Sequence, residues 1–329
     1  MENNSKPESS ILVVTRTNDI TADHVFHRMA ARNIPYVRLN AEDFGMANIE
    51  LRFPSVFDST ITIGDKRISI DSIRGVWLRR LTRPKADQIQ NAEARVFAES
   101  EMDFTLRWLI DLLSNYCLIL DCETKILDGR NKFDQLAIAE KLGFHIPDTI
   151  VTNDPASAKE FVELHETAVI KSVGGYGQQV EGGFYTVYTN IVTKQIFDRF
   201  DTICLAPVCL QEYIEKAFEL RVTIVGQQVF GCRIDSQVAE QTRVDWRHYD
   251  HKTPHSIYVI DERLRGQMIA MMRHYGIRLA SFDLVATPDG RIIFLEMNPA
   301  TQFFWIEELT GMPIADAIID EILSEFPKQ

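Results

Sequence analysis

The sequence predicts a mixed α/β protein that is divided into several domains. Short apolar, β-branched runs, of which 11–15 is the first, alternate with segments whose apolar residues recur at three- and four-residue spacings. The chain has 329 residues, and at roughly 100 to 200 residues per domain this length suits two or three domains. We expect an N-terminal α/β domain over 1–125, a central subdomain over 126–205 and a C-terminal subdomain over 206–329.

The N-terminal domain opens with the pattern of a parallel α/β unit. A strand is expected at 11–15, a helix at 25–30 and a second strand at 36–39. Gly64-Asp65 separates two short runs of alternating polarity, which is a hairpin signal. A further apolar run at 75–80 predicts another strand of the same sheet.

A long helix is predicted over 92–115. Its apolar residues, which include Phe97, Phe104 and Trp108, recur at helical spacings and form one stripe. We expect this aromatic stripe to lie in the core of the domain.

The remainder of the chain alternates strands and helices around two distinctive segments. A glycine-rich loop follows a predicted strand at 168–172, and the segment 236–257 is polar and irregular. Helices are expected at 131–142, 191–200 and 262–275, and further strands at 148–152, 208–214, 220–225, 228–234 and on both sides of the turn at 287–290.

Composition limits the function classes. Hydrophobic residues make up 45% and charged residues 25%, which is typical of a globular enzyme. The formal net charge of −12 disfavours binding to nucleic acid and to anionic membranes. The first ten residues are polar, no membrane-spanning run is present, and the five scattered cysteines suit neither a zinc site nor a disulfide framework. We therefore expect a cytoplasmic protein.

The last hairpin predicts a metal site. Asp283 lies on one strand, and Glu296 and Asn298 face the same way on the next strand because side chains alternate. A symmetric turn over 287–290 would place Phe294 opposite Asp283, with Asp283 diagonal to Glu296. Two carboxylates and an amide oxygen form a hard-oxygen site that suits Mg²⁺. The alternative is a solvent-facing polar face.

A lysine before a glycine-rich loop is the second signal. Lys171 ends an apolar strand, and Gly174, Gly175 and Gly177 follow it, so backbone amides can approach an anion beside a fixed positive charge. A surface loop after an edge lysine is the alternative. Lys132 opens a helix, where a lysine is usually solvated although a helix N-terminus favours a bound phosphate.

The third signal lies between two further strands. The backbone of Glu212, Tyr213 and Ile214 can offer amide and carbonyl groups to a purine ring. Glu219 can accept hydrogen bonds from ribose hydroxyls, and Arg221 would face the same cavity and stabilise charge on a transferring phosphate. An outer face on which Glu219 and Arg221 form a salt bridge is the alternative.

In this order and spacing, these residues resemble the ATP-grasp superfamily of carboxylate–amine ligases over roughly 125–325. The resemblance implies an ATP-grasp fold with a preceding pre-ATP-grasp domain, and ATP and Mg²⁺ as cofactors. The residue roles that it implies are phosphate binding by Lys132 and Lys171 under the glycine-rich loop with Gly174, Gly175 and Gly177, adenine binding by Glu212, Tyr213 and Ile214, ribose binding by Glu219, Mg²⁺ ligation by Asp283, Glu296 and Asn298, and catalysis by Arg221 and Lys171.

A narrower resemblance joins the chain to the microviridin-type peptide ligases, or graspetide macrocyclases. It rests on 75–84 and on 244–250, whose Asp245 and Arg247 resemble an Asp-x-Arg stretch that meets the substrate peptide in those enzymes. The resemblance implies a ribosomally made precursor peptide with leader and core as partner, side-chain ester or amide crosslinks as product, and a homodimer. Arg247 and Arg233 can each clamp a peptide carboxylate.

Several alternatives stay open. A loop salt bridge between Asp245 and Arg247 is as plausible as a substrate role, and ion pairs at a domain interface are the expectation for Arg79 and Arg80. An ATP-grasp ligase that adds an amino acid to a protein tail or to a small acid would have the same ATP site. A non-catalytic nucleotide-binding module and a small-molecule kinase are the remaining candidates.

Overall fold

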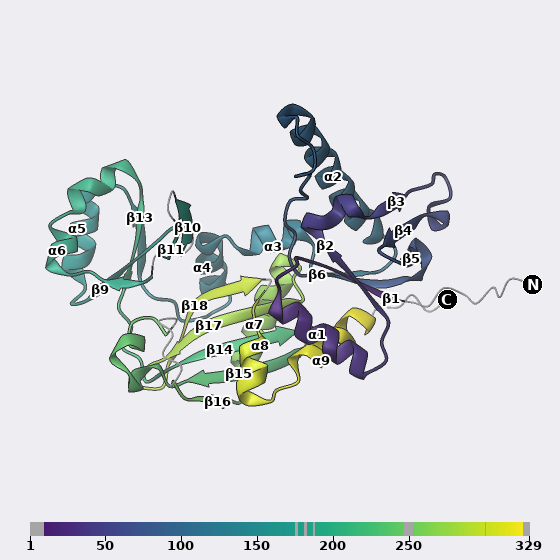
Figure 1. Cartoon of the computed structure of the whole chain (residues 1–329). Helices are drawn as coiled ribbons and strands as arrows, with labels where there is room; N and C mark the ends of the chain where they lie inside the picture. The colour runs from purple at the N-terminus through teal and green to yellow at the C-terminus, as the bar shows by residue number, and fades with distance from the viewer. Residues whose placement is uncertain are drawn as a thin grey trace, which may run out of the picture.

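The structure is a computed structural model of the chain. It describes residues 10–174, 177–180, 183–186, 188–246, 253–299 and 301–324. Figure 1 shows an N-terminal part in purple and blue at one end, a small teal unit at the other end, and a green-to-yellow sheet between and below them.

The N-terminal part is built on a parallel four-stranded sheet with the order β2-β1-β6-β7. The central strand β1 (Ser10–Thr15) is buried along its whole length, as expected of a strand that is covered on both faces. The expected parallel unit and the hairpin are confirmed. The other elements are α1 (Ile20–Ala31), β2 (Tyr36–Asn40), β6 (Ile73–Leu78) and β7 (Leu118–Leu120), with an antiparallel sheet of β3 (Asn48–Glu50), β4 (Thr60–Ile63) and β5 (Lys66–Ser69).

Helix α2 (Ala92–Leu113) forms where it was predicted, but the prediction of its buried face was wrong. Phe97, Phe104 and Trp108 are 67%, 51% and 66% exposed, and the Phe104 and Trp108 rings stack on each other with centroids 5.4 Å apart. The helix rises from the sheet in Figure 1 and packs through a neighbouring stripe. That stripe consists of Leu106, Leu109, Ile110 and Leu113. Apolar residues occupy more than one face of α2, so periodicity could not select the buried one.

The central part is a four-stranded antiparallel sheet with the order β12-β9-β13-β8. Its last strand β13 lies beyond residue 205, so the sheet continues past the expected end of the central subdomain. The elements are α3 (Glu123–Gly129), α4 (Lys132–Lys141), β8 (Thr149–Thr152), α5 (Pro155–Leu164), β9 (Ala168–Lys171), the hairpin of β10 (Gly177–Val180) and β11 (Gly183–Thr186), β12 (Asn190–Ile191), α6 (Lys194–Phe197) and β13 (Val208–Glu212).

The C-terminal part is a five-stranded antiparallel sheet with the order β16-β15-β14-β17-β18. One face packs on α4 and α7, and the other packs on α1, α8 and α9. The elements are β14 (Phe218–Val225), β15 (Gln228–Ile234), β16 (His255–Ile257), α7 (Glu262–Tyr275), β17 (Leu279–Ala286), β18 (Ile292–Pro299), α8 (Phe304–Thr310) and α9 (Ile314–Ser324).

The parallel sheet and the five-stranded sheet are joined by a buried carboxylate. Asp121, which follows β7, accepts hydrogen bonds from the backbone amides of Arg278 at 3.0 Å and Leu279 at 2.9 Å, where β17 begins. Burial raises the pKa of Asp121 to about 6. Helix α9 packs against both β6 and β14, so apolar contacts reinforce this joint.

In the part of the chain that the structure describes, no helix has the length and apolar character that a membrane crossing requires.

Candidate active site

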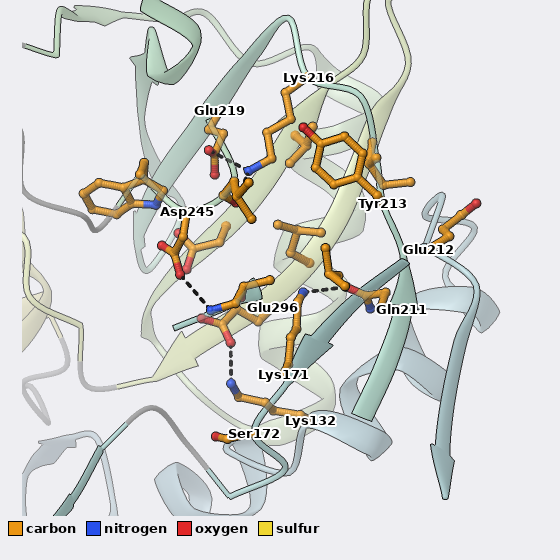
Figure 2. Close-up of a pocket in the computed structure, with 18 residues that line it drawn as sticks. Lys132, Lys171, Ser172, Gln211, Glu212, Tyr213, Lys216, Glu219, Asp245 and Glu296 are labelled. Atoms are coloured by element: carbon orange, nitrogen blue, oxygen red, sulfur yellow. Dashed lines mark hydrogen bonds and ion pairs between the residues drawn. The ribbon is translucent and has the colours of Figure 1, made fainter. Parts of the chain in front are cut away.

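A cavity lies between the central sheet and the five-stranded sheet. Strands β9 and β13 supply one wall, and β14, β17 and β18 supply the other. Figure 2 shows the ammonium groups of Lys132, Lys171 and Lys216 and the carboxylates of Glu219 and Glu296 around this space. The sequence signals from five separate strands therefore meet in one place.

The five-stranded sheet presents a tightly paired polar cluster to the cavity. The Arg221 Nη1 donates to both carboxylate oxygens of Asp283 at 2.7 Å. The Asn298 amide nitrogen donates to Asp283 at 2.8 Å and to Glu296 at 3.1 Å. Hydrogen bonds to charged groups are among the stronger ones in proteins, so this cluster holds its geometry without a ligand.

The strand register differs from the prediction. Asp283 pairs directly with Glu296, whereas Phe294 pairs with Leu284. Leu295 is the extra residue of a bulge beside this pair, and it lines the cavity next to Glu296. A bulge changes the alternation of side chains, which the assumption of a symmetric turn could not capture. The expectation that Asp283, Glu296 and Asn298 share one face is confirmed.

These side chains fit a magnesium ion. Asp283 and Glu296 lie opposite each other on adjacent strands, and Asn298 lies within hydrogen-bond distance of both. In this arrangement the Arg221 guanidinium pairs with Asp283, the Lys132 ammonium pairs with Glu296, and the Asn298 amide donates to both carboxylates. The two ends of an amide side chain are interchangeable by rotation, and rotation of Asn298 would add its oxygen to a donor set that is typical of Mg²⁺.

A buried network of hydroxyl groups supports Arg221 from behind. The Arg221 Nη2 donates to Thr301 Oγ1 at 3.2 Å, and Thr301 Oγ1 lies 2.5 Å from Ser281 Oγ. Ser281 is in turn 2.8 Å from Thr223 Oγ1. All three hydroxyl residues are buried, and such satisfied networks restrict the side chains that they contact.

Lys132 and Lys171 approach the cavity from the other wall. Lys132 begins α4, which Asn131 caps, and its ammonium lies 2.8 Å from Glu296. Lys171 ends β9 and donates to Gln211, whose amide donates to Thr149 at 2.9 Å. Burial lowers the pKa of Lys171, while the charge of Glu296 acts in the opposite direction. A desolvated lysine that is oriented by a neutral partner is suited to binding an anion.

Lys216 is a cavity residue that the sequence analysis missed. Its side chain is 7% exposed, and its ammonium donates to Glu219 at 2.9 Å and to the Val244 carbonyl at 2.8 Å. Burial raises the pKa of Glu219 against the opposing effect of Lys216. The sequence could have indicated this residue, because Lys216 is a charged residue that lies three positions before Glu219, between two predicted strands. Gln211 and the apolar wall residues Val169 and Leu295 were also missed.

The strand end at 212–214 reaches the cavity chiefly through its backbone. The Glu212 side chain points away from the cavity in Figure 2 and accepts from the Asp148 amide at 2.9 Å. The amides of Glu212 and Tyr213 donate to the carbonyls of Asp148 at 2.9 Å and Thr167 at 3.0 Å. Ile214 and the Tyr213 ring line the cavity beside them.

The far wall carries Asp245 and Trp246. Asp245 is buried and accepts from the Thr189 amide at 3.4 Å, and Trp246 packs on Trp305 with ring centroids 5.2 Å apart. Arg247 and Gly175 lie outside the described residues, so the expected Asp245–Arg247 pair is not described.

The glycine-rich loop is described in part. Gly174 is exposed, with open space where a side chain would lie, and Gly177 begins β10. An open backbone at this position is compatible with a close approach to an anion.

Arg233 does not belong to this site, contrary to the prediction. It pairs with Leu220 in the β14–β15 ladder, so it faces away from Glu219 and Arg221. Its guanidinium lies over the Phe218 ring at 4.1 Å, and its Nε donates to Asp235 at 2.7 Å. The register of β15 against β14 determines which face of the sheet the Arg233 side chain lies on.

Arg79 and Arg80 were expected to form ion pairs at a domain interface. Both approach Asp19 of the same N-terminal part instead, at 3.4 Å and 3.9 Å. Arg79 also lines a small cavity together with Leu279 and Thr301 of the C-terminal part.

Comparison with known proteins adds to this geometry. A model of the RimK-like ATP-grasp domain matches residues 129–322, and a model of the MvdD pre-ATP grasp domain matches residues 10–125. A curated relative, the "probable alpha-L-glutamate ligase 1" of Shewanella oneidensis, is 25% identical over 203 residues, which are 60% of this chain and 64% of the relative. Among the first curated relatives, the chain spans 44% to 64% of their length.

Two solved structures resemble the chain over nearly its whole length. The RiPP-associated ATP-grasp ligase of Chryseobacterium gregarium, solved with ADP and a leader and core peptide, is 28% identical with a TM-score of 0.86, and the match covers 97% of this chain and 98% of that one. The macrocyclase MdnC of Microcystis aeruginosa, bound with precursor peptide MdnA, is 28% identical with a TM-score of 0.81, and the match covers 96% and 100%.

The expected ATP-grasp fold with a pre-ATP-grasp domain and the expected resemblance to peptide macrocyclases are thereby confirmed. The ATP-grasp ligase PsnB, solved with minimal precursor, Mg and ADP, is 20% identical and shares this fold. This chain belongs to the RimK-like ATP-grasp family.

Proposed function

We propose that this protein is an ATP-dependent peptide macrocyclase. It would activate Asp or Glu side chains of a ribosomally made precursor peptide and join them to Ser or Thr hydroxyls or to Lys amines of the same peptide. The observation that carries the proposal is the similarity to two peptide-bound ATP-grasp enzymes, which extends over the N-terminal part as well as the ATP-grasp part. The cavity described above has the charges that this chemistry requires.

The proposal assigns the nucleotide to the cavity between the two antiparallel sheets. Lys132 and Lys171 would bind phosphates under the glycine-rich loop that contains Gly174, Gly175 and Gly177. Adenine would lie along the backbone at 212–214, where Ile214 and the Glu212 carbonyl are the candidate partners. Glu219, held by Lys216, would accept hydrogen bonds from the ribose.

Asp283, Glu296 and Asn298 are the proposed magnesium ligands. The ion, when bound, would neutralise phosphate charge and align the transferred phosphoryl group. Arg221 is poised beside these ligands, and with Lys171 it would stabilise the negative charge that develops on the phosphoryl oxygens. Both residues are therefore assigned to catalysis.

The reaction has two steps, which are linked by an acyl phosphate intermediate. In the first step an oxygen of the peptide carboxylate attacks the γ-phosphorus of ATP, the bond to ADP breaks, and an acyl phosphate forms. In the second step a hydroxyl or amine attacks the acyl carbon, phosphate leaves, and the proton of the nucleophile is released. The peptide therefore loses one water for each bond, and ATP becomes ADP and phosphate. Fixed geometry and charge stabilisation suffice for such catalysis.

The peptide would enter beside Asp245 and Trp246, which form the far wall of the cavity. Arg247, whose placement is not described, would clamp a peptide carboxylate, and Asp245 would orient it or bind a peptide donor. We expect Arg247→Ala to weaken use of the peptide far more than binding of ATP. Equal loss of both would assign this segment to structure.

A second function is favoured by the curated relatives, which are named as alpha-L-glutamate ligases. Such an enzyme would use the same nucleotide site and the same acyl phosphate, but its nucleophile would be the amine of a separate amino acid. The chain would then add mass to its substrate, whereas a macrocyclase removes water.

Intact mass spectrometry distinguishes the two functions. A precursor peptide encoded beside this gene is incubated with enzyme, Mg²⁺ and ATP, and the Glu296→Gln variant serves as control. Loss of one or more waters with the wild type alone would support macrocyclisation, and resistance of the new bonds to mild base would identify amides. Gain of a residue mass would overturn the proposal in favour of the glutamate-ligase function.

Three further proposals concern the whole molecule. We propose a division at 125/126, in agreement with the change from parallel to antiparallel sheets, and at 205/206, where strand β13 reaches back from the C-terminal side into the central sheet. The five cysteines are free thiols, which supports a cytoplasmic location.

We also propose a homodimer, supported by the exposed aromatic face of α2. A Trp108→Glu substitution in this face should shift the sedimentation coefficient toward that of a monomer. An unchanged sedimentation coefficient would show that α2 does not form the dimer interface.

A further inference from the structure

The parallel N-terminal sheet has a topological switch point at which no role has yet been assigned. From β1 the chain continues to β2 on one side, and it later returns to β6 on the other side of β1. In open parallel sheets, ligands bind in the crevice outside the carboxyl ends of the two strands where the order reverses. Here the crevice is bordered by the residues that follow β1 and β6.

Arginines follow both of these strands. Arg16 follows β1 directly, and Arg79 and Arg80 follow β6 directly. Asp19, which caps α1, lies 3.4 Å from Arg79 and 3.9 Å from Arg80. Burial lowers the pKa of Arg79 to about 10, and the charges of Arg80 and Arg16 act in the same direction against Asp19. The positive charges are thus close enough to repel one another.

Hydrogen bonds connect the loop that follows β1 to the segment that follows β6 and to β2. Glu42 accepts from the Thr17 amide at 2.6 Å and from the Thr82 hydroxyl at 3.1 Å, so it ties the loop after β1 to the segment after β6. Arg38 donates to the carbonyl of Arg16 at 2.7 Å and pairs with Asp23 at 2.6 Å. The hydrogen bonds of Glu42 and the ion-paired Arg38 therefore hold the backbone of the loop that carries Arg16.

The cluster is adjacent to the catalytic side of the ATP-grasp part. Arg79 is 3% exposed and lines a small cavity together with Asp121, Leu279 and Thr301. Thr301 accepts the hydrogen bond from Arg221 at 3.2 Å, so it lies between Arg79 and the arginine assigned to phosphoryl transfer. Arg80 is less buried, and Arg16 is exposed, so the cluster is open to solvent on that side.

The nucleotide is not the anion that this cluster would bind. The cavity of Figure 2 is lined by Lys132 and Lys171, the proposed phosphate ligands, and by Lys216, and none of the three clustered arginines lines it. A planar guanidinium fork matches a carboxylate in geometry and in charge. The substrate of the proposed reaction carries such carboxylates and must place one of them beside Arg221.

We propose that Arg16, Arg79 and Arg80 form a binding site for a side-chain carboxylate of the substrate peptide. This inference rests on the proposed function, and it assigns to the N-terminal sheet the capture of an Asp or Glu side chain next to the phosphoryl-transfer site. Arg79 provides the buried floor of the site, and Arg80 and Arg16 provide its open rim. The site selects acidic peptides by charge pairing before any bond is made.

The test compares two peptides with four forms of the enzyme. The probes are the precursor peptide encoded beside this gene and a twin in which every core Asp and Glu is replaced by Asn or Gln. Affinities for the ADP- and Mg²⁺-loaded protein are measured by calorimetry with wild type, Arg80→Gln, Arg79→Lys and Arg67→Gln. Arg67 is an exposed arginine on β5 of the same domain and controls for the loss of one positive charge.

We expect the wild type and Arg67→Gln to prefer the acidic peptide on the order of 10-fold or more, since charged hydrogen bonds contribute at this level. Arg80→Gln should lose most of that preference while its affinity for the amide twin is unchanged. Arg79→Lys, which keeps the charge and loses the fork, should show an intermediate preference. A preference that survives in Arg80→Gln, or an equal loss for both peptides, would overturn the inference.

The same samples separate this inference from the proposed function. A wild type that prefers the acidic peptide but never removes water from it would refute macrocyclisation and leave the carboxylate site intact. A wild type that removes water but does not discriminate between the two peptides in binding would leave the function intact and refute the site.

Discussion

Two charge clusters lie on either side of the joint between the parallel sheet and the five-stranded sheet. In the first cluster, Arg79 and Arg80 approach the carboxylate of Asp19, and the charge of Arg16 helps to lower the pKa of Arg79. In the second, the acidic pair of Asp283 and Glu296 is held by Arg221 and an amide.

The contrast teaches that strand direction determines which side chains can meet. Parallel strands bring together the residues that follow their carboxyl ends, as in Arg16 and Arg79. Antiparallel strands bring together residues within the strands, as in Asp283 and Glu296. The first arrangement gathers positive charge at the strand ends, which suits an anion, and the second forms a compact donor set that suits a cation. Substitutions in each cluster can test whether one binds an anion and the other a cation.

The largest effect is expected from Arg221→Ala. Loss of the guanidinium removes the positive charge beside the transferring phosphoryl group, and we expect turnover to fall at least on the order of 10³-fold. Single-turnover conversion of ATP to ADP with the precursor peptide measures it, and the melting temperature should stay close to that of the wild type. Arg221→Lys keeps the charge and is the matched control. A wild-type rate in Arg221→Ala would exclude this residue from the mechanism.

The next effect is expected from Glu296→Gln. This change removes one carboxylate of the proposed magnesium set and leaves Lys132 without its partner at 2.8 Å. Turnover should fall by about 100-fold or more, and saturation should require more Mg²⁺. A titration of rate against Mg²⁺ concentration measures both. Glu163→Gln, on the exposed side of α5, should behave as wild type. An unchanged Mg²⁺ requirement in Glu296→Gln would argue against ligation.

A third effect concerns the joint between the clusters. The pKa of Asp121 is raised from its ordinary 3.8 to about 6, so the folded protein keeps this proton to a higher pH than the unfolded chain does. The contribution of Asp121 to stability is therefore complete below about pH 4 and is lost as pH rises through about 6. The difference between the folded and unfolded pKa of Asp121 corresponds to about 3 kcal/mol in the free energy of unfolding.

Asp121→Asn abolishes this titration. As pH rises from 4 to 7, the wild type should lose up to about 3 kcal/mol of its free energy of unfolding relative to Asp121→Asn. Urea unfolding at several pH values measures the difference, and the exposed Asp65→Asn is the control. Parallel pH profiles for wild type and Asp121→Asn would contradict the raised pKa.

The smallest effect is expected from Thr301→Val, a positioning residue. The substitution removes the hydroxyl that accepts from Arg221 and contacts Ser281, and it keeps the volume of the side chain. We expect kcat to fall by about 10-fold with little change in KM for ATP, because ground-state binding of the nucleotide does not involve this contact. Thr301→Ser restores the hydroxyl and should restore kcat. If Thr301→Ser fails as Thr301→Val does, the methyl group and not the hydroxyl is required.

Much of the fold could be predicted from local patterns. The strand at 11–15, the hairpin around Gly64 and the helix at 262–275 each carry a periodicity or turn signal that short-range physics determines. The buried face of α2 could not be predicted, because its apolar residues allow more than one stripe and only the position of the sheet selects among them. Arg233 could not be assigned correctly either, since its face depends on the ladder with β14.

The sequence by itself determined the types of chemistry: which segments carry lysine, glycine, carboxylate and arginine, and in what order along the chain. The whole ordered set of motifs, from Lys132 and Lys171 to Glu296 and Asn298, predicted an ATP-grasp fold through its resemblance to that superfamily. The tertiary structure alone decided the pairing. The bulge at Leu295 placed Asp283 directly against Glu296. The crossing of the chain from β2 to β6 brought Arg16 to Arg79. Contacts between residues distant in sequence depend on register and topology, and local periodicity carries no information about either.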